Sequence, residues 1–313
     1  MDSEKEFYER LRNKGVSRRD FMKFCTVLTA TMGLSASFVP RVAEVFAAPK
    51  ERPPVIWLHF GECTGCSEAM LRTTYPYADE LVLEILSVEY HETIMVAAGE
   101  QAEDQLHAAL KKYSGKFICV AEGSIATKYN GGYGKIAGRS FLEIAKEVVP
   151  QAAATIAFGS CASWGGIPAA KPNPGGYMGV GEALNTKVLK IPGCPPNPIN
   201  LVGTIVNYLL LGKLPELDGQ GRPLFAYGKT IHDQCPRRSH FENEEFVTEF
   251  GSEDAALGYC LYKMGCRGPE TYNNCPVAKF NDGTSWPVEA GHPCIGCSEP
   301  DFWDKMSPFY EEI

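Results

Sequence analysis

The stretch from His232 to Cys297 constrains this 313-residue chain more than any other. Glycine and proline recur throughout it, so it has little continuous apolar periodicity from which to build a core of its own. Something other than hydrophobic burial must therefore fix its backbone, and bound metal would do so. The segment carries seven candidate ligands, which are His232, Cys235, Cys260, Cys266, Cys275, Cys294 and Cys297.

Three chemistries could use these ligands. A structural zinc site needs four ligands in tight pairs, and seven ligands do not divide into two closed tetrahedra. Iron-sulfur clusters account for seven ligands better, because they bind cysteine thiolates with an occasional histidine. A Cys-Pro dipeptide also recurs at cluster sites. That dipeptide begins at Cys194, Cys235 and Cys275. The tract favours iron-sulfur clusters, with zinc and disulfides as the alternatives.

The charge of the chain excludes one class of partner. Its formal net charge is -8, from 30 basic and 38 acidic side chains. Residues 1 to 47 hold 8 of the basic and 6 of the acidic ones, so the remainder is more acidic still. A chain this acidic is not expected to bind nucleic acid.

The N-terminus has the pattern of a targeting segment, 1-47, which we leave out of the fold prediction. Residues 17 to 23 resemble the twin-arginine export motif, and an uncharged stretch follows from Phe24 to Val39. That stretch is too short to span a bilayer as a helix. The run Val45-Phe46-Ala47 predicts a cleavage signal, a mature start near Ala48 and a periplasmic location. The alternative is a basic amphipathic helix.

The number of cysteines agrees with export of a metal-loaded protein. Cys25 would leave with the segment 1-47, and eleven of the 12 cysteines would remain. An odd number cannot all pair in intramolecular disulfides. Twin-arginine export is associated with proteins that cross already folded, often with an inserted cofactor, and fragile clusters would need such a route.

Residues 48-212 predict an α/β domain with a mostly parallel sheet and helices on both faces, because strand and helix patterns alternate along them. A helical pattern also starts at Glu68. The expected strands are 55-60, 83-89, 116-121, 155-159 and 187-192, and the expected helices include 101-112, 139-149 and 201-211.

Cysteines follow three of these strands. Cys63 and Cys66 come after the first, although a Cys-x-x-Cys here could equally be a thioredoxin-like redox pair. Cys161 and Cys194 follow the last two strands. If the three strands are parallel, all four cysteines meet at one edge of the sheet, enough for one cluster. Cys119 lies inside an apolar strand, and we interpret it as a buried free thiol.

Regular patterning fades after residue 212. We expect residues 213-313 to form a second, irregular domain that holds the cysteine tract. The chain ends in a short aromatic stretch, so no C-terminal membrane anchor is expected.

Five short motifs, in this order, resemble those of the small, electron-transferring subunit of a nickel-iron hydrogenase. The resemblance covers the targeting segment and nearly all of the remaining chain. The motifs are Glu62 to Cys66, Ile191 to Pro198, His232 to Cys235, Thr271 to Cys275 and Gly291 to Cys297.

The resemblance implies a flavodoxin-like domain followed by a cluster-rich domain, with three clusters in line. It implies that hydrogen is split at a nickel-iron site in a separate large subunit, and that this chain passes electrons to an external carrier, for which a c-type cytochrome is the candidate. The implied ligands are Cys63, Cys66, Cys161 and Cys194 for a proximal 4Fe-4S cluster, His232, Cys235, Cys260 and Cys266 for a distal 4Fe-4S cluster, and Cys275, Cys294 and Cys297 for a medial 3Fe-4S cluster.

Three positions refine this expectation. Pro287 stands where relatives with a four-iron medial cluster carry a cysteine, so a three-iron cluster is expected. Oxygen-tolerant relatives carry two extra proximal cysteines at the positions of Gly65 and Gly166, so an ordinary proximal cluster is expected.

Two other interpretations stay open: an exported module with structural zinc or disulfides, and the cluster-bearing subunit of a quinone-reducing complex. The latter shares the flavodoxin-like domain but lacks the long cysteine tract.

Overall fold

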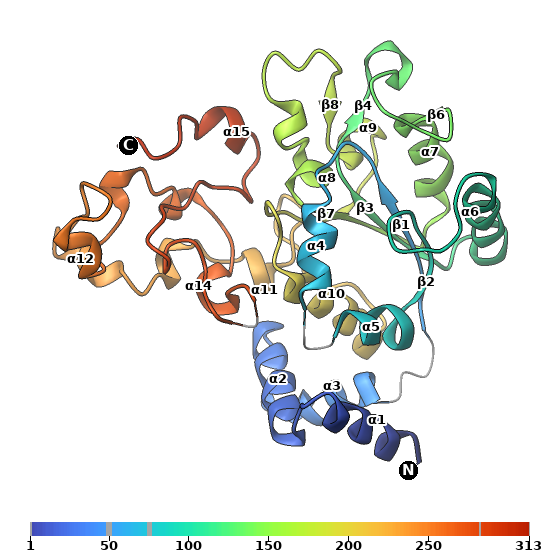
Figure 1. Cartoon of the computed structure of the whole chain (residues 1–313), viewed down its shortest axis with the longest axis horizontal. Coiled ribbons are helices and arrows are strands. Elements are labelled where there is room, and N and C mark those ends of the chain that lie inside the picture. Colours follow the sequence, from blue (N-terminus) through green and yellow to red (C-terminus); the bar gives the residue numbers. More distant parts are fainter. Residues whose placement is uncertain (1, 48–51, 74–76, 282, 313) are drawn as a thin grey trace.

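A five-stranded parallel sheet organises the first half of the chain (Figure 1). The computed structural model describes residues 2-47, 52-73, 77-281 and 283-312, so the predicted start at Ala48 lies outside the described residues. Every pairing in the sheet is parallel, as the alternating pattern predicted. In spatial order the strands are β2 (Ser87–His91), β1 (Pro54–His59), β3 (Ile118–Glu122), β7 (Ala154–Phe158) and β9 (Leu189–Ile191).

One predicted strand is partly wrong. The expected strand 83-89 begins in a π-helix, Leu81–Ile85, and the chain becomes extended only at β2. The run Leu-Val-Leu-Glu-Ile-Leu is apolar nearly throughout, and such a run does not distinguish helix from strand by periodicity.

Helices cover both faces of the sheet (Figure 1). On one face, α6 (Glu100–Tyr113) and α7 (Phe141–Val148) pack against Ile56, Leu58 and Cys119. On the other, α4 (Gly65–Leu71) and α10 (Pro198–Leu211) share a core with Trp57 and Val120. The sheet is therefore buried on both faces, which accounts for its nearly continuous apolar strands.

Local caps explain why two helices differ from their predicted bounds. Helix α7 begins at Phe141 rather than 139, because Ser140 and Glu143 form a reciprocal capping box. Helix α10 begins three residues earlier than predicted, with Pro198 in its first turn and the Asn197 side chain accepting a hydrogen bond from the Ile199 N–H at 3.1 Å.

Short elements complete this domain. They are α5 (Ala78–Glu80), β4 (Ile125–Ala126), η3 (Lys128–Gly131), β5 (Lys135–Ile136), β6 (Arg139–Ser140), η4 (Val149–Gln151), α8 (Ser160–Trp164), η5 (Ile167–Ala169), β8 (Tyr177–Met178) and α9 (Val180–Ala183). Strand β4 pairs with β8, and β5 with β6, in two small antiparallel sheets.

Residues 2-47, which we call the N-terminal segment, fold into helices packed against this domain (Figure 1). Nothing in the sequence pattern predicted this packing. The elements of the segment are α1 (Asp2–Asn13), α2 (Arg18–Thr31), η1 (Ala36–Phe38) and α3 (Val39–Ala47). No helix among the described residues is both long and apolar enough to cross a membrane.

The C-terminal part is irregular, as predicted. Only isolated bridges, such as Thr230 with Tyr272, link its extended segments in the described structure. Its small core of Ile231, Val247, Leu261 and Trp286 also contains the buried side chains of ligand candidates. Its helices are α11 (Leu224–Tyr227), η6 (His232–Gln234), α12 (Arg238–Glu242), α13 (Glu253–Ala256), η7 (Tyr262–Met264), η8 (Gly268–Glu270), α14 (Cys275–Ala278) and α15 (Phe302–Lys305).

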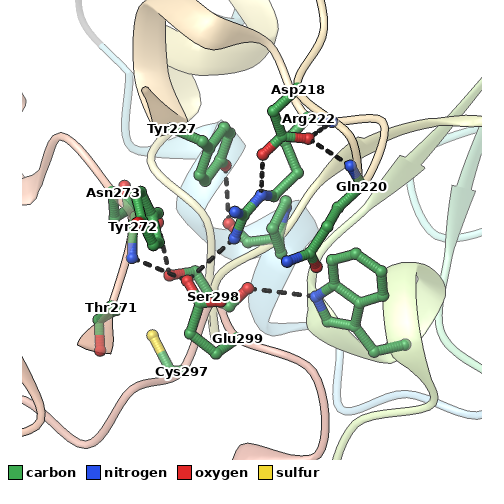
Figure 2. Close-up of polar contacts among 12 residues, drawn as sticks. Asp218, Gln220, Arg222, Tyr227, Thr271, Tyr272, Asn273, Cys297, Ser298 and Glu299 are labelled. Carbon is green, nitrogen blue, oxygen red and sulfur yellow. Dashed lines mark hydrogen bonds and ion pairs between the residues drawn. The ribbon is translucent and has the colours of Figure 1, made fainter. Parts of the chain in front are cut away.

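A buried ion pair joins the chain on either side of the cysteine tract (Figure 2). The Arg222 guanidinium donates to Asp218 at 2.7 Å and to Glu299 at 2.9 Å, and its side chain is only 3% exposed. Glu299 also accepts the N–H of Tyr272 at 2.7 Å. These bonds hold the loop around Cys297 against residues 218-222, and the Gly221 carbonyl there accepts the Lys190 N–H of the first domain at 2.9 Å.

Candidate metal centres

The first group of cysteines lies at the carboxyl edge of the sheet. Cys63 and Cys66 follow β1, Cys161 follows β7 and Cys194 follows β9. Burial raises the pKa of the Cys66 thiol well above its usual value, and the negative charges of Glu122, Cys161, Cys194 and Cys63 raise it further. The parallel sheet thus brings together the four cysteines that were expected at one edge.

Glycines pack directly on two of these sulfurs. A Cβ at Gly159 would collide with Cys66 Sγ, and one at Gly166 would collide with Cys161 Sγ. Both glycines have positive φ angles, +95° and +61° respectively. The loops therefore close around the sulfurs in a way that a side chain at either position would prevent.

Glu122, at the end of β3, orders the start of α4. Its buried carboxylate accepts the backbone N–H groups of Cys66 and Ser67, each at 3.1 Å, the Ser67 hydroxyl at 2.5 Å and the Trp57 indole at 3.3 Å. This residue was not among those predicted from the sequence. A charged residue ending the apolar run of β3 was the available signal.

The second group, Cys275, Cys294 and Cys297, comes from α14 and the loop before α15. Burial raises the pKa of the Cys294 thiol, and Cys266, Cys297 and Cys275 raise it further. The three cysteines line one cavity of about 1090 Å³. Pro287 lines the same cavity.

The third group gathers Cys235, Cys260, Cys266 and His232 around a smaller cavity. Burial and the neighbouring thiols raise the pKa of Cys260 to about 11, while the Tyr262 N–H and the charge of Arg237 act in the opposite direction. Burial lowers the pKa of His232, and Arg238 lowers it further. A lowered pKa favours the neutral imidazole, which is the form that can bind metal.

The three groups touch one another in sequence. Cys194 of the first group and Cys297 of the second line the same cavity, so the two groups adjoin each other. The Cys294 N–H donates to Cys266 Sγ at 3.4 Å, which joins the second group to the third. The second group therefore lies between the other two.

These donor sets fit iron-sulfur clusters better than the alternatives. All twelve cysteines are free thiols, so the disulfide interpretation fails. Among the described residues, no group of three or more His, Cys, Asp and Glu lies close enough together to hold a single metal ion. Buried thiols with raised pKa values need a nearby positive charge to ionise, and a bound metal would supply it.

Cys119 stands apart from the three groups, as predicted. It is fully buried in β3, and burial raises its pKa to about 12. Such a thiol behaves as a small apolar side chain.

Two family descriptions match the two parts of the chain. Residues 63–208 match the family described as NADH ubiquinone oxidoreductase, 20 Kd subunit. Residues 227–310 match the family that describes the C-terminal part of NiFe/NiFeSe hydrogenase small subunits. The periplasmic [NiFe] hydrogenase small subunit 1 of Nitratidesulfovibrio vulgaris is 55% identical over 306 residues, covering 97% of this chain and 96% of the relative. The chain is a nickel-iron hydrogenase small subunit.

Further relatives agree with this assignment. The quinone-reactive Ni/Fe-hydrogenase small chain of Wolinella succinogenes is 50% identical, covering 97% of this chain and 86% of the relative. A crystal structure of a reduced, active form of the Ni-Fe-Se hydrogenase from Desulfomicrobium baculatum has a TM-score of 0.79 at 36% identity, covering 84% of this chain and 100% of that chain.

The hydrogenase small subunit is the electron-transfer partner of the large subunit in an oxidoreductase that acts on hydrogen. The interpretation as a subunit of a quinone-reducing complex is wrong for the whole chain, because the match to that family ends at residue 208 while the hydrogenase family covers the cysteine tract.

Proposed function

We propose that the three cysteine groups of this small subunit hold three iron-sulfur clusters that relay electrons between the large subunit and an external carrier. The first group, Cys63, Cys66, Cys161 and Cys194, would hold a 4Fe-4S cluster. The third, His232, Cys235, Cys260 and Cys266, would hold another. The second, Cys275, Cys294 and Cys297, would hold a 3Fe-4S cluster. Such clusters supply one-electron redox chemistry.

The observation that carries this proposal is the continuity of the three groups. Cys294 belongs to the second group, and its own N–H donates to a sulfur of the third at 3.4 Å. Cys194 belongs to the first, and it lines the same cavity as Cys297 of the second. Isolated structural zinc sites would have no need of this direct adjacency.

The residues at the two ends of the line have different tasks. Cys63 and Cys194 are exposed at the sheet edge, which leaves room for close approach by a large subunit. His232 lies at the other end, beside Phe241 at a ring separation of 4.7 Å. A neutral imidazole replaces one thiolate there and makes the group less negative, which favours electron arrival from the centre of the chain.

We propose that the domains follow the same division. Residues 48-212 form the flavodoxin-like domain with the first cluster, and residues 213-313 form the cluster-binding domain with the other two. The acceptor is an external carrier, for which a c-type cytochrome is the candidate.

We propose further that residues 1-47 are a twin-arginine signal removed on export to the periplasm. The relative from N. vulgaris, which is named periplasmic, aligns with 97% of this chain. The solved chain from D. baculatum aligns along its whole length with only 84% of it, leaving unmatched a share about the length of residues 1-47.

Substitution of Cys294 tests the relay. In the heterodimer, Cys294→Ser should lower hydrogen-driven reduction of an external carrier at least about tenfold. It should leave the rate of hydrogen-deuterium exchange at the nickel-iron site near that of wild type. Cys119→Ala, which removes a thiol outside the three groups, should change neither rate. Equal loss of exchange and carrier reduction in Cys294→Ser would refute the relay.

A further inference from the structure

Helix α8 carries a ligand candidate of the first group and contacts the loop that holds one of the second. Cys161 lies in its first turn, between Ser160 and Trp164. These two residues are four positions apart, so their side chains lie on the same side of the helix. The Ser160 hydroxyl donates to the Cys297 carbonyl, and the Trp164 indole N–H donates to the Ser298 carbonyl at 3.2 Å (Figure 2). One side of α8 therefore binds two consecutive carbonyls of that loop.

The Ser160 hydroxyl also holds the loop before Cys194. The Gly193 N–H donates to Ser160 Oγ at 2.9 Å, and the Ser160 N–H donates to the Gly193 carbonyl at 2.9 Å. Because the hydroxyl oxygen accepts from Gly193 while its single proton goes to Cys297, it acts as donor and acceptor at once. Its side chain is 1% exposed, so little water can compete for these bonds. One hydroxyl thus connects Cys161, the loop of Cys194 and the loop of Cys297.

The Tyr227 hydroxyl links the two domains less directly. It donates to the Pro192 carbonyl at 2.7 Å, two positions before a ligand candidate. Ser160 instead precedes Cys161 in the chain and bonds the carbonyl of Cys297 itself. From Cys161 to Cys297 the structure therefore contains a path of covalent bonds and one hydrogen bond.

We propose that Ser160 is a positioning residue for electron transfer between the first and second groups, an inference that rests on the proposed function. Its hydroxyl holds the peptide of Cys297 at a fixed separation from Cys161. The step that it serves moves one electron from the first cluster to the second, and no covalent bond forms or breaks. Because the rate of electron tunnelling falls exponentially with the separation of the two centres, a small displacement of Cys297 would slow this step strongly.

The atoms that Ser160 bonds distinguish positioning from adjustment of a redox potential. Hydrogen bonds to the sulfurs of an iron-sulfur cluster help to set its potential. Ser160 bonds the carbonyl oxygen of Cys297 and not its sulfur. Loss of the hydroxyl should therefore slow electron transfer and leave the midpoint potential of the second cluster near that of wild type.

Freeze-quenched paramagnetic resonance of the purified heterodimer tests the proposal, with the three-iron signal of the second group as the readout. In Ser160→Ala, hydrogen should abolish this signal at least about tenfold more slowly than in wild type. Reduced methyl viologen, which supplies electrons from the carrier end, should abolish it at the wild-type rate, because that route does not pass Ser160. Hydrogen-deuterium exchange at the large subunit, the iron content and the midpoint potential should stay as in wild type.

Two further variants separate positioning from the loss of any buried polar group. Ser163→Ala is the matched control, because Ser163 is a buried serine of the same helix that donates to the Ala157 carbonyl at 3.2 Å, within the first domain. Both rates should equal those of wild type. Trp164→Phe removes only the donor to Ser298 and keeps an aromatic ring, so it should slow the hydrogen-driven loss, by less than Ser160→Ala does.

The outcomes that would overturn the proposal differ from those that would overturn the relay. A wild-type hydrogen-driven rate in Ser160→Ala would refute the positioning role and leave the relay intact. Equal slowing from both ends, or the same slowing in Ser163→Ala, would assign Ser160 to folding alone. If Ser160→Ala does not assemble, a wild-type rate in Trp164→Phe would refute the proposal. Wild-type protein without a three-iron signal would overturn this proposal and the proposed cluster assignment together.

Discussion

The backbone N–H of Cys294 donates to the sulfur of Cys266 at 3.4 Å, so a residue of the second cysteine group contacts a residue of the third directly. The two cysteines are 28 positions apart in the chain. Hydrogen bonds to sulfur also adjust the potential of a bound cluster. This contact therefore links the two groups both in space and in their electronic surroundings.

Replacement of His232 should separate electron exit from hydrogen chemistry. His232→Ala removes the imidazole from the third group, so electron delivery to a protein acceptor should fall about tenfold to a hundredfold. Hydrogen-deuterium exchange at the large subunit should fall far less. His240→Ala is the matched control, because His240 forms a hydrogen bond with Glu245 and does not line the cavity of the third group. Equal loss of both activities in His232→Ala would show that His232 serves folding alone.

The second group should hold a three-iron cluster because Pro287 supplies no ligand. Pro287 lines the cavity shared by Cys275, Cys294 and Cys297, as a fourth ligand position must. Oxidised wild-type protein should give a three-iron signal in low-temperature paramagnetic resonance, and Pro287→Cys should abolish it without loss of iron. Ser285→Cys, on the same cavity, should retain it. A fully iron-loaded wild type without the signal would contradict the assignment.

Air should inhibit the assembled enzyme, which should recover only after reduction. Gly65 and Gly166 adjoin the sulfurs of Cys63 and Cys161. The family resemblance implies that oxygen-tolerant members carry extra cysteines at these two positions. Glycine offers no sulfur, so the first cluster should move between two redox states only. Protein-film electrochemistry under added oxygen measures this. Sustained hydrogen oxidation would mean that tolerance arises from something other than ligation of this cluster.

Loss of Arg222 should destabilise the junction beside Cys297. Arg222→Met leaves the buried carboxylate of Glu299 and the half-buried one of Asp218 without their cation, at a cost of about 3–5 kcal/mol. Lys305→Met breaks only the exposed pair with Asp301 and should leave stability nearly unchanged. Thermal unfolding of the two variants compares them. Equal stability of Arg222→Met and wild type would show that the ion pair does not stabilise the packing beside Cys297.

The positions of the first cysteine group could be predicted from sequence, since parallel strands bring their carboxyl ends to one edge, and Cys161 and Cys194 each follow a strand. The ion pair between Arg222 and Glu299 could not be predicted. The two residues are 77 positions apart, and the sequence around each gives no indication of the other as its partner. Leu28 was also out of reach: an apolar stretch in a targeting segment has the same composition whether or not it packs on α10. The start of β2 was predicted too early because the run before it is apolar nearly throughout, so its periodicity does not distinguish a helix from a strand.

Metal analysis of the purified heterodimer tests the presence of the three clusters most directly. We expect iron and sulfide in the small subunit equal to two four-iron clusters and one three-iron cluster, with visible iron-sulfide absorption that bleaches under hydrogen. Stoichiometric zinc in place of iron, or absorption that hydrogen does not change, would contradict the relay.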